Sequence, residues 1–198
     1  MERSALVSIP FCAYKESETM KVNAITIANW FVDKYQQDTE HQSNKLTLLR
    51  LVKLVYIAHG FMLAVCDRGL LDPRFDRVEA WRFGPVIPSV YHSFKHNGKN
   101  TIIDKASVLI GYDYNEEPVF ISPELSFSEE TDNDKNRIQS CLEFVWNYYI
   151  LCNANLLVGI THKEGTPWET CYVPGENKEI PDDTTKNYYK ELVSEISA

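Results

Sequence analysis

The sequence has few of the features that mark secreted, membrane-spanning or disulfide-stabilised proteins. Only five of the 198 residues are cysteines, their number is odd, and no CxxC pair occurs. This pattern argues against a disulfide framework or a cysteine-based zinc site and favours a reducing compartment. No stretch approaches the ~18 consecutive apolar residues that suggest a membrane span, and the short N-terminal stretch before Cys12 lacks the pattern of a signal peptide. We therefore expect a cytoplasmic protein without a membrane partner.

Positive charge is also scarce. The chain has 20 Lys and Arg against 28 Asp and Glu, a formal net charge of −8. An open nucleic-acid groove needs a positive surface to neutralise phosphates, so direct nucleic-acid binding is not expected. The nucleotide-binding patterns GxGxxG and GxxxxGK[ST] and the nucleophile-elbow pattern GxSxG do not occur, and we expect no cofactor. An acidic chain of this kind fits a partner with a basic face.

The pattern of apolar residues indicates a mainly helical protein. Residues 1–19 show no periodicity and are interpreted as a poorly ordered N-terminal extension, while 20–198 form one domain. Periodic patterns predict helices over 24–36, 48–65, 88–96, 134–152, 154–163 and 184–196. Strand-like patterns cover 78–83, 108–112 and 119–121, and the last two predict a hairpin that turns near Asn115-Glu116. The expected fold class is α+β, mainly α: a compact bundle of five to six helices around a central apolar helix, with a small antiparallel sheet.

The helix over 48–65 is apolar on nearly every face, so the rest of the domain must enclose it. Its polar residues are therefore informative. Arg50 and Lys53 lie about 60° apart around the axis, which predicts one basic edge facing solvent, with His59 pointing inward on the opposite side. Gly60 costs about 1 kcal/mol of helix stability relative to Ala. The close approach of another backbone segment would explain its presence.

Two groups of aromatic residues stand near prolines. Trp81, Phe83 and Tyr91 surround Gly84-Pro85, and Trp168 and Tyr172 follow Pro167. Large aromatics occur both in cores and at the centres of binding surfaces, and the core is the more common place. We expect one of Trp81 and Phe83 to be exposed, with Arg82 on the face opposite both.

Other constellations have weaker support. His59, His162 and Cys171 could serve a small hydrolase as base and nucleophile, but no local motif supports this arrangement and buried cysteines are commonly inert. A transcriptional regulator would need a basic face hidden in the fold. Its candidates are Arg50, Lys53, Arg74, Arg77 and Arg82.

Four motifs, in order along the chain, together resemble those of the Panacea domain family, also called SocA-like or GepA-like phage-associated proteins. TLLRLVKLVYIAHG at 47–60 is similar to the family's TxxKLQKLLYYAHG, and EAWRFGPVIPSVY at 79–91 to its EAWxxGPVxPxxY. FKHNG at 94–98 matches FKxxG, and LVGITH at 157–162 followed by PW at 167–168 is similar to LxxxTHxxxPW. The chain departs at Val52, where the family's KLQK has a glutamine. The motif residues that could be purely structural are Tyr56, His59, Gly60, Gly84, Thr161 and His162.

The resemblance implies a protein-binding antitoxin, often encoded on prophages, and not an enzyme. Its partner would be a cognate protein toxin, neutralised by direct binding or, as in the SocA branch, by delivery to a cytosolic AAA+ protease. A hydrolase and a transcriptional regulator remain the alternatives. The residues expected to contact the partner are Trp81, Arg82, Phe83, Pro85, Tyr91, Trp168, Arg50 and Lys53.

Overall fold

A computed structural model describes residues 22–127 and 130–196. The expected N-terminal extension, 1–19, lies outside the described residues. The described helices are α1 (Ala24–Gln37), α2 (Leu48–Cys66), α3 (Pro88–Phe94), the 3-10 helix η2 (Lys95–Asn97), α4 (Asp132–Tyr149), α5 (Ala154–Thr161), α6 (Pro167–Cys171) and α7 (Asp182–Ile196). The described strands are β1 (Glu79–Trp81), β2 (Gly84–Val86), β3 (Val108–Tyr112), β4 (Pro118–Ile121) and β5 (Lys178–Glu179). The predicted fold class, mainly helical α+β with a central apolar helix, is confirmed, and the short α6 is an addition to it.

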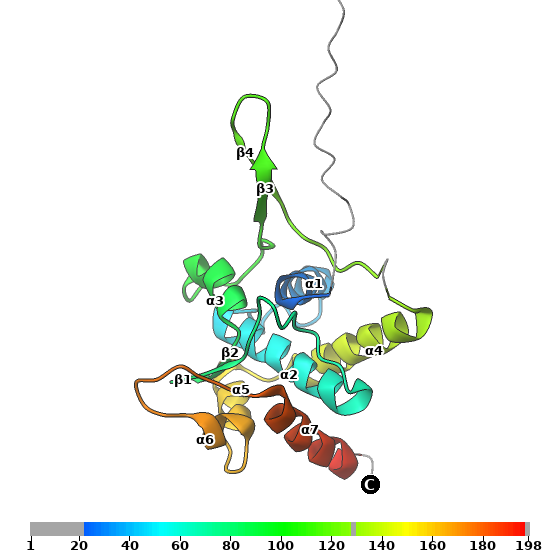
Figure 1. The fold of residues 1–198 in the computed structure, drawn as a ribbon, viewed down its shortest axis with the longest axis vertical. Coiled ribbons are helices and arrows are strands. Elements are labelled where there is room, and N and C mark those ends of the chain that lie inside the picture. The colour runs from blue at the N-terminus through cyan, green and yellow to red at the C-terminus, as the bar shows by residue number, and fades with distance from the viewer. Residues whose placement is uncertain (1–21, 128–129, 197–198) are drawn as a thin grey trace, which may run out of the picture.

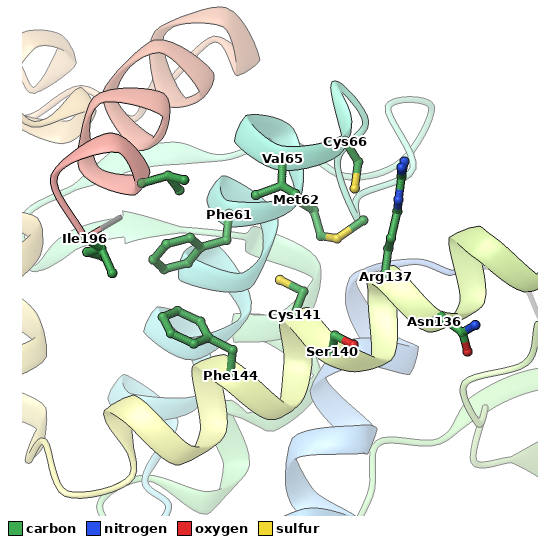
Figure 2. A pocket seen from close by; sticks show the side chains of 11 residues that line it. Phe61, Met62, Val65, Cys66, Asn136, Arg137, Ser140, Cys141, Phe144 and Ile196 are labelled. Atoms are coloured by element: carbon green, nitrogen blue, oxygen red, sulfur yellow. The ribbon is translucent and has the colours of Figure 1, made fainter. Parts of the chain in front are cut away.

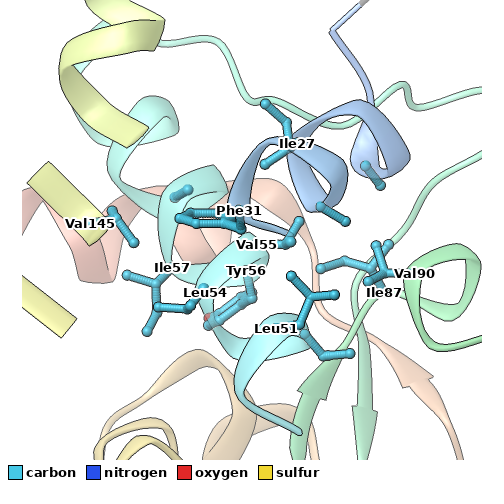
Figure 3. Close-up of a cluster of buried hydrophobic side chains, with 14 of the residues drawn as sticks. Ile27, Phe31, Leu51, Leu54, Val55, Tyr56, Ile57, Ile87, Val90 and Val145 are labelled. Atoms are coloured by element: carbon cyan, nitrogen blue, oxygen red, sulfur yellow. The ribbon is translucent and has the colours of Figure 1, made fainter. Parts of the chain in front are cut away.

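Helix α2 runs through the middle of the molecule, and the other helices surround it (Figure 1). Its side chains Leu51, Leu54 and Val55 meet Phe31 of α1 and Val90 of α3 in one cluster of buried apolar residues (Figure 3). By length and composition α2 could cross a membrane, but 78% of its apolar stretch is buried inside the described fold. Its apolarity is therefore that of a core helix.

The expectation for Gly60 is partly corrected. A methyl group there would collide with the ring of Tyr189, which lies on α7. The element that approaches α2 so closely is thus an aromatic side chain and not another backbone segment. A residue with a side chain would push α7 away from the central helix, because buried rings have no room to move.

The first hairpin differs from its prediction. A single strand was expected over 78–83, broken by Gly84-Pro85, but β1 ends at Trp81 and Gly84-Pro85 belong to β2, which pairs with β1 antiparallel. Gly84 adopts a φ of +98°, which glycine reaches without strain. Pro85 has no N–H to donate, and β2 is an edge strand in the order β2-β1-β5, where none is required.

The second hairpin, β3–β4, forms as predicted, and Asn115-Glu116 lie at its turn, where Glu116 has a φ of +63°. Leu109 pairs with Phe120, and the register shifts by one residue before Gly111 pairs with Val119. Figure 1 shows this hairpin standing away from the helical body, above α1 and α3. The two hairpins are therefore placed very differently.

Candidate functional site

A groove of about 480 Å³ lies beside the first hairpin, between the start of α2 and α3. We call it the hairpin groove. Its lining includes Leu48, Val52, Trp81, Arg82, Phe83 and Tyr91. Four of the expected partner-contacting residues thus meet at one concave, mostly apolar surface.

The two aromatic residues of the first hairpin have different surroundings. Trp81 is half-buried, packs edge-to-face on Tyr91 with ring centroids 4.9 Å apart, and donates from Nε1 to a Glu79 carboxylate oxygen at 2.8 Å. Phe83 is 60% exposed. The expectation that only one of the two projects into solvent is therefore met, and that residue is Phe83.

Arg82 is not on the face opposite Phe83. Its guanidinium carbon lies 5.4 Å from the centre of the Phe83 ring. The prediction assumed strand alternation, but Arg82 and Phe83 form the turn between β1 and β2, where side chains do not alternate between two faces. An exposed aromatic ring and a cation therefore share the tip of this turn.

Trp168, from α6, supports the hairpin from behind. Its side chain is buried, and its Nε1 donates to the carbonyl oxygen of Trp81 at 2.7 Å. The indole stacks on His162 with centroids 3.6 Å apart and on Tyr172 at 4.6 Å. The motif that ends in Pro167-Trp168 therefore holds the position of the first hairpin.

The predicted basic edge of α2 is wrong, because Arg50 and Lys53 are both buried. Lys53 is 0% exposed, and its Nζ donates to the carbonyl oxygen of Pro85 at 2.8 Å. Arg50 donates to the carbonyl oxygens of Lys45 at 2.8 Å and Ile150 at 2.7 Å. Helical spacing correctly placed the two on one edge, but β2 and the end of α4 cover that edge. Burial lowers the pKa of both groups, that of Lys53 to about 7.

Gly84 lies where three elements meet. A methyl group at this position would be 2.7 Å from Lys53 Nζ and 3.0 Å from His162 Nε2. His162 Nε2 is buried and has no hydrogen-bond partner among the residues that the structure describes. Burial, and secondarily the charge of Lys53, lower the pKa of His162. Lys53 and His162 thus leave no room for a side chain at Gly84.

Thr161 and His59 have structural partners. Thr161 Oγ1 donates to the carbonyl oxygen of Leu157 at 3.1 Å, within α5. His59 is buried as expected, accepts the Leu70 N–H at Nδ1 (3.1 Å), and contacts an Asp182 carboxylate oxygen through Nε2 at 3.0 Å. That hydrogen bond lowers the pKa of the Asp182 carboxyl group. His59 therefore joins α2 to the loop after it and to α7.

The hydrolase constellation is not assembled. Both ring nitrogens of His59 are occupied by Leu70 and Asp182. Cys171 Sγ has its contact with Thr170 Oγ1, at 3.8 Å. Among the residues that the structure describes, no group of three or more His, Cys, Asp or Glu could hold a metal ion.

The basic face required of a transcriptional regulator does not form either. Besides the buried Arg50 and Lys53, Arg74 pairs with Asp72 at 2.7 Å. Arg77 lies 3.8 Å from a Glu79 carboxylate oxygen. The five residues proposed for such a face are therefore buried, neutralised by neighbouring acids, or placed at the aromatic turn.

A second groove, of about 430 Å³, lies between α2, α4 and α7 (Figure 2). Phe61 and Phe144 meet edge-to-face in it, with ring centroids 5.1 Å apart, and Val65 and Ile196 are exposed along it. The sequence patterns did not predict this groove. The available signal was Phe144, an apolar residue outside the buried stripe of α4.

Comparison with known proteins agrees with the motifs. The family described as Antitoxin SocA-like, Panacea domain, matches residues 51–169, which include Lys53, the first hairpin, His162 and Trp168. Antitoxin SocA of Caulobacter vibrioides (strain NA1000 / CB15N) is 34% identical over 164 residues, covering 81% of this chain and 76% of that protein. No solved structure gives a significant match. The chain therefore belongs to the SocA-like Panacea domain family.

Proposed function

We propose that this chain is an antitoxin that acts in the cytoplasm and neutralises a cognate protein toxin by binding it at the hairpin groove. Its homology to a protein named antitoxin SocA supports the class of function. The observation that carries the site is the exposed Phe83, held at a braced turn above an apolar groove. Aromatic and arginine side chains are the most frequent anchors of protein interfaces.

The bracing matters because binding costs less when the surface is already ordered. The first hairpin is fixed by Lys53, through the Pro85 carbonyl, and by Trp168, through the Trp81 carbonyl. Phe83 and Arg82 therefore lose little backbone freedom when a partner docks. Lys53 and Trp168 therefore support this site from beneath, without touching the partner, whereas the buried Arg50 bonds to Lys45 and Ile150, away from the hairpin.

The groove also indicates the chemistry of the contact. Val52 lines it at the position where the family pattern has a glutamine. The side chain of valine cannot form a hydrogen bond with a partner. A polar group of the partner that became buried against it would therefore stay without a hydrogen bond, which is unfavourable. Val52 is only 2% exposed and forms part of the floor of the groove, so we infer that the toxin inserts an apolar side chain into the groove above it.

The test uses the product of the reading frame adjacent to this chain's gene as the candidate toxin. We expect the wild-type chain to suppress its toxicity and to bind it, and Phe83→Ser to weaken binding by about 10-fold or more, as for an interface anchor. Phe75→Ser is the matched control, because Phe75 is also exposed and has a guanidinium, that of Arg74, 5.2 Å from its ring centre. If Phe83→Ser and Phe75→Ser bind the candidate toxin with equal affinity, the groove is not part of the interface. Failure of the wild type to bind or rescue would overturn the antitoxin function itself.

A measurement in cells that produce both this chain and the candidate toxin distinguishes blocking of the toxin from its delivery to a AAA+ protease. If the chain blocks the toxin, the toxin persists in the complex, and its half-life is unchanged or longer when the chain is present. Delivery shortens that half-life, and the effect disappears in cells that lack the protease. A pulse-chase measurement of the toxin, with and without the chain, separates these two modes of neutralisation.

A further inference from the structure

The second hairpin contributes nothing to the core. We call residues 107–122 the arm; they comprise β3, β4 and the turn between them. None of them belongs to the buried core of the described residues. The arm rises as a lone two-stranded ribbon from the helical body (Figure 1). Such a ribbon is at best marginally stable by itself, so its retention needs another explanation.

One face of the arm is apolar and open. Leu109, Tyr112 and Phe120 are 48%, 67% and 58% exposed, and Leu109 pairs directly with Phe120. The register shift after Leu109 brings Tyr112 and its partner Pro118 onto this same face. No charged residue lies within either strand. Charged side chains within a strand are a common protection against pairing with other chains, and the two strands of the arm lack them.

The base of the arm, in contrast, is firmly fixed. Asn29 of α1 is buried, and its side-chain amide donates to the carbonyl oxygens of Ala106 at 3.1 Å and Pro123 at 2.8 Å. Its Oδ1 accepts the Ala106 N–H at 2.8 Å. All three bonds therefore go to the two chain segments that carry the arm.

A second group of polar contacts lies at the base of the arm. Lys105 Nζ bridges Asp33 of α1, at 3.2 Å, and Glu124, which follows β4, at 2.9 Å. Ser107 and Ser122 are the two end residues of the arm, and their hydroxyl oxygens lie 3.1 Å apart. The arm is thus held in a defined direction while its apolar face has no cover among the described residues, as is expected of a segment that is presented to a partner.

The negative charge of the arm indicates what kind of partner it can bind. Its turn carries three acids, Asp113, Glu116 and Glu117, and residues 107–122 contain no Lys or Arg. Two copies of this arm would bring like charges together, in a chain whose net charge is −8. A partner with basic residues around an apolar surface matches both features.

We propose that the arm is a second contact with the protein bound by the hairpin groove, and that its apolar face covers a surface of that protein with a basic rim. Asn29 is a positioning residue that directs the arm. This inference rests on the proposed function, and it states what kind of toxin surface the chain recognises.

The experiment measures the dissociation constant of the complex with the candidate toxin, the product of the adjacent reading frame, at low and at high salt. Tyr112→Ser combined with Phe120→Ser should weaken binding by about 10-fold or more, because both are exposed and their loss removes contact area without unfolding the domain. Glu116→Lys combined with Glu117→Lys should slow association and weaken its dependence on salt. Phe75→Ser again serves as the exposed-aromatic control. Circular dichroism and sedimentation check that each variant remains folded.

Asn29 is tested by rescue. Asn29→Ala should weaken binding and speed hydrogen exchange of the arm amides. Ser107→Cys with Ser122→Cys, added to Asn29→Ala and oxidised, should restore the base of the arm and with it the affinity, and reduction should remove the rescue. If Asn29 only stabilised α1, a disulfide at the base of the arm would not restore the affinity. Absence of rescue, with the disulfide formed, overturns the positioning role.

The outcomes separate the two proposals. If the wild type and the arm variants bind equally while Phe83→Ser fails, the arm is not a contact and the antitoxin function stands. If the wild type does not bind, the antitoxin function fails, and the arm's assignment to this partner fails with it. If the chain alone forms a dimer that Tyr112→Ser with Phe120→Ser abolishes, the arm's partner is a second copy, and the proposal is wrong.

Discussion

The molecule has two antiparallel hairpins that differ in what surrounds them. The β1–β2 hairpin is short and rests on α2 and α6, with only its turn in solvent. The arm is longer, and its apolar residues remain open to solvent. A buried polar side chain fixes each one, Lys53 for the first hairpin and Asn29 for the arm. Packing thus makes the first hairpin part of the core, while the arm is joined to the domain only at its base.

The largest expected effect is at Gly84, in the packed hairpin. Gly84→Ala forces a side chain into a φ of +98° and against Lys53 Nζ, so we expect a loss of about 3 kcal/mol in the free energy of unfolding. Gly159→Ala is the control, because it lies in α5 with open space at its Cβ position and should be neutral or slightly stabilising. Denaturant unfolding measures both. Equal stabilities would mean that the close contact at Gly84 does not exist.

A matched pair of valines compares the hairpins directly. Val86 of β2 is buried, while Val119 of β4 is half-buried. Removing two methyl groups should cost about 2 kcal/mol for Val86→Ala and about 0.5 kcal/mol for Val119→Ala. The same unfolding measurement provides both values. A larger loss at Val119 than at Val86 would contradict the view that the arm lies outside the core.

The first hairpin should also make the stability of the domain depend on pH. Burial lowers the pKa of Lys53 from 10.5 to about 7, so between these values the unfolded chain binds more protons than the folded one. The free energy of unfolding should therefore rise with pH, by about 1.5 kcal/mol from pH 7 to pH 8.5. Lys53→Met should remove this rise, and Lys190→Met, at an exposed site, should keep it. A wild type whose stability falls or stays level across this window would exclude a desolvated Lys53.

Much of the fold was predictable because it follows from local patterns. The helices over 24–36 and 48–65 were found from apolar periodicity, and Asn23, whose side chain accepts the N–H groups of Ile25 and Thr26, marks where α1 begins. The arm was predictable from its two strands and turn. The local sequence pattern could not show that no other described segment packs against the arm, because that depends on where distant parts of the chain lie.

The candidate site was predictable only in part. The motif around residues 79–91 located the groove, but periodicity could not show that Arg50 and Lys53 face β2 and α4 instead of solvent. Helical periodicity shows which residues lie on the same edge of a helix, but only tertiary packing decides what covers that edge. Asn29 was missed for the same reason, since its partners Ala106 and Pro123 lie 77 and 94 residues away in the chain.

Hydrogen exchange of the chain, alone and bound to the candidate toxin, tests most directly whether both hairpins contact the same partner. In the free chain, the amides of the arm should exchange much faster than those of β1 and β2, because the arm lacks packing. In the complex, we predict protection at the turn of Arg82 and Phe83 and along the arm. Protection confined to other surfaces, such as the groove between α4 and α7, with both hairpins unchanged, would contradict the account.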